Sequence, residues 1–118
     1  MERFRIAGEA RLDGAVEVAG AKNSVLKLMA AALLAEGTTT LRQVPGILDV
    51  TFMAQLLDTL GCEVTVDGEL GIATIAVPGS VGHQCDYELV RKLRASISVL
   101  GPLLARCGQA EVALPGGD

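Results

Sequence analysis

Apolar residues recur along the chain with two different spacings, and the two spacings predict short strands alternating with helices. Residues 3–7 and 14–19 alternate polar and apolar side chains, which predicts two strands near the N-terminus. Residues 21–36 are apolar on nearly every side at helical spacing. This predicts a helix in the middle of a domain, and Gly37 is placed to close it.

The rest of the chain continues the alternation, with three local signals that mark turns and ends. Asp49 is expected to cap a helix, and Asp67-Gly68 is typical of a hairpin turn. Gly101-Pro102 is expected to kink or break the last helical stretch. The predicted elements are strand 38–44, helix 50–60, strands 62–66 and 70–77, helical stretches 87–93 and 95–106, and strand 109–114.

The order of these elements predicts an α/β (α+β) fold. A weak internal repeat is consistent with it. Leu33-Leu34-Ala35 leads through a glycine and a strand to Pro45-Gly46, and Leu103-Leu104-Ala105 leads in the same way to Pro115-Gly116. We interpret the two segments as copies of one helix–strand unit that share a core.

Composition narrows the possible functions. Half of the 118 residues are hydrophobic and only 3% are aromatic, so the core is expected to be aliphatic. No apolar run reaches the roughly 18–20 residues of a membrane span, which indicates a buried core and no membrane partner. The net charge of −4 provides no global basic field for nucleic acid. The N-terminus shows no apolar signal region, which predicts a cytoplasmic protein.

The cysteines and the histidine suggest no metal centre. Cys62, Cys85 and Cys107 are odd in number and widely spaced, and His83 is the one histidine. This pattern favours neither zinc nor a disulfide framework. Small buried thiols in a reducing compartment are the expected alternative.

Two clusters carry candidate chemistry. Lys22 and Asn23 lie in the segment G-A-K-N-S, at a predicted strand-to-helix turn whose free backbone N–H groups favour an anion. The alternative is a solvated lysine beside an ordinary helix start. Arg91, Lys92 and Arg94 lie within one predicted helical turn, with both arginines on one face. They predict either a phosphate or carboxylate clamp or a solvated basic face.

Asp118 follows two glycines. Two interpretations of Asp118 are open: an acid carried on a mobile loop, or an ordinary acidic residue in a turn. No role is expected for His83.

These segments together resemble one family. The residues that carry the resemblance are F-R-I-x-G at 4–8, G-A-K-N-S at 20–24, L-L-A-E-G-T-T at 33–39, V-P-G-I-L-D-V at 44–50, L-G-C-E-V at 60–64, L-R-A-S at 93–96, L-G-P-L-L-A-R at 100–106 and L-P-G-G at 114–117. The chain is similar over its whole length to the enolpyruvyl transferase family, in its UDP-N-acetylglucosamine 1-carboxyvinyltransferase branch. The sister enolpyruvylshikimate-phosphate synthases share the fold but not this set of motifs.

The resemblance implies a reaction and its participants. The enolpyruvyl group of phosphoenolpyruvate moves to the 3′-hydroxyl of UDP-N-acetylglucosamine, and phosphate is released, in the first committed step of peptidoglycan synthesis. Lys22 and Asn23 match the pair that contacts phosphoenolpyruvate, and Arg94 matches an arginine associated with the UDP-sugar. Arg91 matches no family site. Asp49 lies in a matching segment, and its main expected role is to cap a helix, with a functional role second. No cofactor or metal is implied, because the substrate already carries the activated enol group.

Asp118 stands where the family usually has a loop cysteine. In the family that cysteine is described as the acid that protonates the enol methylene carbon, and fosfomycin alkylates it. We hypothesise that Asp118 donates this proton and that its carboxyl group escapes fosfomycin. The ordinary pKa of Asp is about 3.9, so burial or a neighbouring anion must raise it.

The resemblance also implies the organisation of the chain. The family has two lobes built from repeated βαβαββ units, with the substrates between them. Residues 1–20 are expected to be strands that complete the other lobe, and residues 21–118 part of the first lobe, ending at the catalytic loop. The remainder of the enzyme is then a necessary partner, and the 118 residues alone are expected to be nearly inactive.

Two alternatives stay open: a non-catalytic half-lobe that binds a partner or a nucleotide sugar, and a 3-phosphoshikimate 1-carboxyvinyltransferase-like enzyme.

Overall fold

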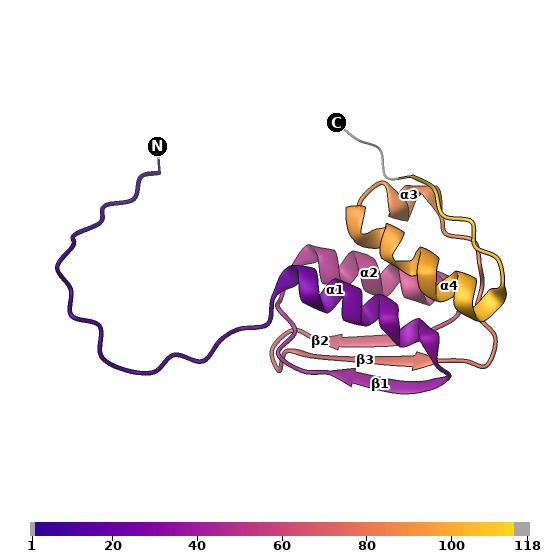
Figure 1. Cartoon of the computed structure of the whole chain (residues 1–118), viewed down its shortest axis with the longest axis horizontal. Helices are drawn as coiled ribbons and strands as arrows, with labels where there is room; N and C mark the ends of the chain where they lie inside the picture. Colours follow the sequence, from indigo (N-terminus) through magenta and orange to yellow (C-terminus); the bar gives the residue numbers. More distant parts are fainter. Residues whose placement is uncertain (1, 115–118) are drawn as a thin grey trace.

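A computed structural model describes residues 2–114. Helices cover one face of a small antiparallel sheet (Figure 1). The helical elements are α1 (Lys22–Ala31), the 3₁₀ turn η1 (Ala32–Leu34), α2 (Leu48–Thr59), α3 (Tyr87–Val90), η2 (Arg94–Val99) and α4 (Leu100–Cys107). The strands are β1 (Gly37–Leu41), β2 (Glu63–Asp67) and β3 (Ile72–Val77). The predicted α+β class is confirmed.

The sheet has the order β1-β3-β2, with both pairs antiparallel. The predicted hairpin is confirmed, since Asp67 pairs with Ile72 across its mouth. The Asp67 carboxylate accepts hydrogen bonds from the backbone N–H groups of Glu69 and Leu70, which holds the turn. The turn of this hairpin lies at the same end of the strands as the starts of α1 and α2 (Figure 1).

An aliphatic core lies between the sheet and the helices. Alternate residues of β3 are buried, namely Ala73, Ile75 and Val77, because successive strand side chains point to opposite faces. They pack with α1 and α2, whose Met29 and Met53 are fully buried. On the far side of these two helices lie α3, η2 and α4 (Figure 1). Within residues 2–114 no helix is both long and apolar enough to cross a bilayer.

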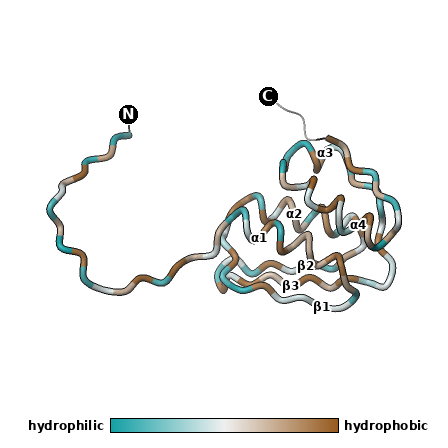
Figure 2. The backbone as a smooth tube through the Cα atoms, viewed as in Figure 1, coloured by the Kyte–Doolittle hydropathy of each residue, from teal (hydrophilic) through white to brown (hydrophobic). Residues whose placement is uncertain are grey.

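The two strands predicted near the N-terminus do not form. Residues 2–20 leave the body of the protein as an extended segment with no strand in it (Figure 1). Their polar–apolar alternation is visible in Figure 2. The apolar members are at least 80% exposed, namely Phe4, Ile6, Leu12, Val16 and Val18. A strand needs a neighbour to receive its N–H and C=O groups, and no other part of the described chain supplies one.

Several predicted boundaries are also wrong. The helix predicted over 21–36 tightens to 3₁₀ geometry at Ala32, and the helix predicted over 87–93 ends at Val90. Gly101-Pro102 does not break α4, because Pro102 lies in its first turn, where its missing N–H costs no hydrogen bond. The predicted stretch 95–106 instead changes from 3₁₀ to α geometry between Val99 and Leu100, just before this pair. The predicted strand 109–114 is reduced to one parallel bridge between Gln84 and Glu111 in the described residues. Pro115-Gly116, the end of the second copy of the proposed repeat, lies outside the described residues.

Candidate functional site

Lys22 is the first residue of α1, at the turn predicted to favour an anion. The N-cap residue, Ala21, has no side chain that caps the helix. The first backbone N–H groups of α1 are therefore left without a side-chain acceptor, and they carry the positive end of the helix dipole. Lys22 is more than half exposed and adds a full charge at this end.

Asp49 meets Lys22 from the neighbouring helix. The Lys22 Nζ lies 2.6 Å from the Asp49 Oδ2, and the Asp49 side chain is 28% exposed against 57% for Lys22. The prediction that Asp49 caps its own helix is wrong, because α2 begins at Leu48 with Ile47 at the N-cap. Asp49 lies inside the first turn of α2, where its charge complements the helix dipole while it pairs with Lys22.

The two helix starts are brought together by close main-chain packing. A Cβ on Gly20 would overlap the carbonyl oxygen of Gln43, so only glycine allows the chain before α1 to approach this closely. On the other side, the Val44 N–H donates to the Gly71 carbonyl at 2.8 Å. Gln43 itself has a positive φ of 56°. The segment between β1 and α2 is thus held between the start of α1 and the hairpin.

This geometry favours a small anion. α1 and α2 run side by side in the same direction, so their positive ends meet at one edge of the molecule (Figure 1). The Lys22 ammonium has three N–H donors and Asp49 engages it through one oxygen, which leaves donors for a ligand. A hollow of about 320 Å³ lies beside this edge, lined in part by Gly20, Ser24 and Arg42.

A larger hollow lies elsewhere. It measures about 580 Å³, lies between α2 and β2 and is lined mostly by apolar side chains such as Ile47, Val64 and Val66. Lys22, Asn23 and Asp49 line neither of these two hollows. The candidate site is therefore defined by the ion pair and the two helix starts, with the smaller hollow beside the start of α1.

Of the other predicted site residues, the structure describes Asn23 and Arg94. Asn23 follows Lys22 in the first turn of α1 and is exposed. Arg94 is the first residue of η2, which packs against α1, and it is also exposed. Within residues 2–114 no ion pair joins Arg94 to Lys22 or Asp49. Asp118 lies outside the described residues.

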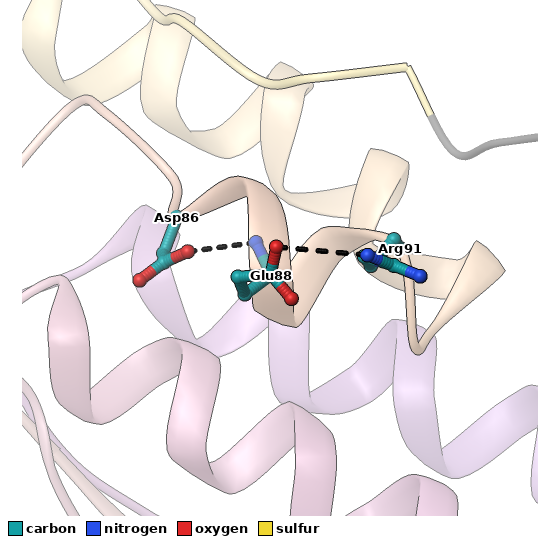
Figure 3. A network of polar contacts seen from close by, with 3 residues as sticks. All are labelled: Asp86, Glu88 and Arg91. Carbon is teal, nitrogen blue, oxygen red and sulfur yellow. Dashed lines mark hydrogen bonds and ion pairs between the residues drawn. The ribbon is translucent and has the colours of Figure 1, made fainter.

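The basic cluster does not form the shared face that its spacing predicted. α3 ends at Val90, and Leu93 is extended, with φ −140° and ψ 106°, so Arg91 and Arg94 are not one helical turn apart. Asp86 caps α3 by accepting from the Glu88 N–H at 2.7 Å, and Glu88 pairs with Arg91 at 3.6 Å (Figure 3). Arg91 is therefore an exposed residue at the end of this short helix, paired with Glu88. Arg94 is also exposed, and no ion pair to it occurs within residues 2–114.

The cysteines lie away from the candidate site. Burial raises the pKa of the Cys85 thiol to about 11. Burial also raises the pKa of the Cys62 thiol, against the opposing charge of Arg106. Such thiols are poor nucleophiles near neutral pH. No cluster of three metal-ligating side chains occurs in the part of the chain that the structure describes.

Sequence reasoning missed the partnership of Asp49 with Lys22. Its one signal was an acid at a helix start, which capping explains equally well. The pairing joins residues 27 positions apart in the sequence.

The fold belongs to a known class of proteins. A family model described as EPSP synthase (3-phosphoshikimate 1-carboxyvinyltransferase) matches residues 6–118, so the chain belongs to this family. The crystal structure of the enolpyruvyl transferase NikO from Streptomyces tendae is similar, with a TM-score of 0.71 and 26% identity. The match covers 86% of this chain and 23% of that one.

Within the family, the chain is similar to proteins named UDP-N-acetylglucosamine 1-carboxyvinyltransferase. It is 58% identical to the one from Corynebacterium efficiens, 57% to that from Nocardia farcinica and 56% to that from Corynebacterium jeikeium. Each match covers 99% of this chain. The chain spans only 27–28% of the length of these relatives.

Proposed function

We propose that the protein carrying this chain transfers the enolpyruvyl group of phosphoenolpyruvate to the 3′-hydroxyl of UDP-N-acetylglucosamine and releases phosphate. The observation that carries the proposal is the identity of 56–58% over 99% of the chain with relatives named for this activity. The reaction belongs to peptidoglycan synthesis, and through it to cell shape, cell division and the cell cycle. We place it in the cytoplasm.

Lys22 and Asn23 are proposed to bind phosphoenolpyruvate. This substrate is small and carries a carboxylate and a phosphate. An ammonium group, uncapped backbone N–H groups and a side-chain amide at one helix start complement it in charge and in hydrogen bonding. Arg94 is proposed to bind the UDP-sugar, whose diphosphate suits a guanidinium group.

The reaction needs an acid and a base besides these cations. The sugar hydroxyl gives its proton to a base and adds to the enol carbon, while the methylene carbon takes a proton from an acid. The resulting tetrahedral ketal then loses phosphate and a proton from the new methyl group, which restores the double bond of the enolpyruvyl group. We assign the proton donation to Asp118, which must be held protonated for this step. The general base is proposed to lie outside these 118 residues. Because Asp118 lacks a thiol, we also propose that the enzyme is insensitive to fosfomycin.

We propose that residues 2–20 pair with another part of the protein. Their exposed alternating apolar side chains are those of a strand without a neighbour. Residues 21–118 then form part of one lobe, and both lobes are needed to enclose the substrates and exclude water. The 118 residues alone are accordingly expected to be nearly inactive.

Phosphate release by the full-length natural gene product tests the proposed reaction. We expect release from phosphoenolpyruvate that depends on UDP-N-acetylglucosamine. Lys22→Ala should lower kcat/KM for phosphoenolpyruvate by about 100-fold or more, as loss of a charged substrate contact does. Lys27→Ala is the matched control, because Lys27 lies on the same helix and is exposed. Equal losses in both variants would contradict the role of Lys22.

A second candidate is transfer to shikimate 3-phosphate, which the description of the family model favours. The same assay separates the two acceptors, since phosphate release that depends on shikimate 3-phosphate alone selects the second. Binding of UDP-N-acetylglucosamine without any phosphate release would instead indicate a non-catalytic module.

A further inference from the structure

We propose that Asp49 is a positioning residue that holds the Lys22 ammonium group in place for phosphoenolpyruvate. The inference rests on the proposed function and adds a residue to it. The contact that carries it is the 2.6 Å ion pair across the starts of α1 and α2.

The Lys22 side of the pair is largely exposed and the Asp49 side is partly exposed, so we expect the pair to contribute little to stability. Exposed ion pairs contribute little to the free energy of folding, since the charges are screened by water and two side chains must be ordered. Lys22 is 57% exposed. A contact this short on an exposed lysine is better suited to restricting the position of the ammonium group.

Asp49 is itself held in place. It lies in the first turn of α2, where the helix dipole favours its charge. Val50, the next residue, is buried, which anchors this turn of the helix to the core. The preceding segment is fixed by the contact of Gln43 with Gly20 and the hydrogen bond from Val44 to Gly71. A long, flexible lysine side chain is thereby held by a short side chain on a fixed backbone.

The remaining charges at this edge support the same role. Asp49 neutralises Lys22 in the absence of substrate, yet one carboxylate oxygen occupies only one of the three ammonium donors. A phosphate or carboxylate can therefore bind Lys22 without displacing Asp49. Arg42 lines the hollow that Gly20, Ala21 and Ser24 also line, so this hollow beside the start of α1 carries a cation of its own.

The positioning role is tested with Asp49→Ala and Asp49→Asn in the full-length protein. We expect Asp49→Ala to lower kcat/KM for phosphoenolpyruvate about 10- to 100-fold, the loss that a misplaced substrate-binding group produces. Asp49→Asn, which keeps an oxygen acceptor, should lose less. KM for UDP-N-acetylglucosamine and the melting temperature should barely change. Asp58→Ala is the matched control, because Asp58 is an exposed acid on the same helix.

A double-mutant cycle separates positioning from a general structural effect. If Asp49 acts through Lys22, then Asp49→Ala should cost little further activity in a Lys22→Ala background. An equal loss in both backgrounds, or a kcat/KM of Asp49→Ala within twofold of wild type, would overturn the proposal.

The contact is also tested without any assay of activity. Acetylation of lysines by an activated acetate ester, followed by mass spectrometry, should proceed several-fold faster at Lys22 in Asp49→Ala than in wild type. Lys27 is the internal control and should be unchanged. If the full-length protein transfers no enolpyruvyl group but Lys22 still reacts faster in Asp49→Ala, the proposed function is refuted and the ion pair between Asp49 and Lys22 is supported. An unchanged rate would refute the contact itself.

Discussion

Gly20 and Gln43 pack main chain against main chain, so closely that no side chain fits between them. This contact sets the start of α1 against the segment that leads into α2. Lys22 follows two residues after Gly20, and Asp49 lies in the first turn of α2. The glycine of the G-A-K-N-S motif is thus explained by close packing beside the candidate site.

Gly20→Ala is expected to push these two segments apart. The new methyl group would overlap a main-chain oxygen, which cannot rotate away as a flexible side chain does. We expect a loss of about 1–3 kcal/mol in the free energy of unfolding, as for other overpacked sites. Chemical denaturation measures it. Gly46→Ala is the matched control in the neighbouring loop, because no heavy atom lies within 4 Å of a Cβ there.

Arg106 is expected to be a structural residue. Its Nη1 donates to the carbonyl of Leu33 at 2.8 Å, and its Nη2 donates to those of Pro78 and Gly79 at 3.1 and 3.2 Å. Arg106→Met should cost about 2 kcal/mol of stability, because these acceptors lose a charged donor. Arg91→Met, which removes only an exposed pair, should stay within about 0.5 kcal/mol in the same unfolding experiment. Similar losses in both variants would contradict the bridging role of Arg106.

Cys85 is expected to make stability depend on pH in the alkaline range. Burial raises the pKa of its thiol from 9.0 in the unfolded chain to about 11 in the folded one. The unfolded state therefore loses the proton first, and the free energy of unfolding should fall as pH rises from about 9 towards 11. Urea unfolding at several pH values measures this slope. Cys85→Ser should reduce this slope. Part of the slope should remain in that variant, because burial also raises the pKa of the Cys62 thiol.

Residues 2–20 are expected to exchange their amide hydrogens quickly in the 118-residue chain. They form no strand there, whereas the amides of α1 and α2 are hydrogen-bonded within their helices. In the full-length natural gene product the same segment should be protected if it pairs with another part of the protein. Hydrogen exchange read by mass spectrometry compares the two. Fast exchange in both would rule out the proposed pairing.

Asp118 is expected to be essential in the full-length protein, although it lies outside the described residues. Asp118→Asn removes the proton that the methylene carbon needs and should lower kcat by about 100-fold or more. Incubation with fosfomycin should leave the wild-type enzyme active, and Asp118→Cys should make it sensitive. Full activity of Asp118→Asn would show that Asp118 is not the acid. Time-dependent inactivation of the wild type that the same substitution abolishes would show that the Asp118 carboxyl group does not escape fosfomycin.

The sequence by itself determined the elements that depend on local patterns. The apolar periodicity located α1, α2 and α4, and Asp67-Gly68 located the hairpin, because spacing and turn chemistry act over a few residues. Helix ends were less predictable. The tightening at Ala32 and the early end at Val90 depend on packing as well as on local propensity.

Only the tertiary structure decided which residues meet. Asp49 looked like a cap in the sequence and proved to be the partner of Lys22, because main-chain packing brings two helix starts together. Arg91 and Arg94 looked like one face and are separated by the end of α3. The alternation in residues 2–20 is that of a strand, yet no strand forms, since pairing needs a neighbour that a local pattern cannot provide.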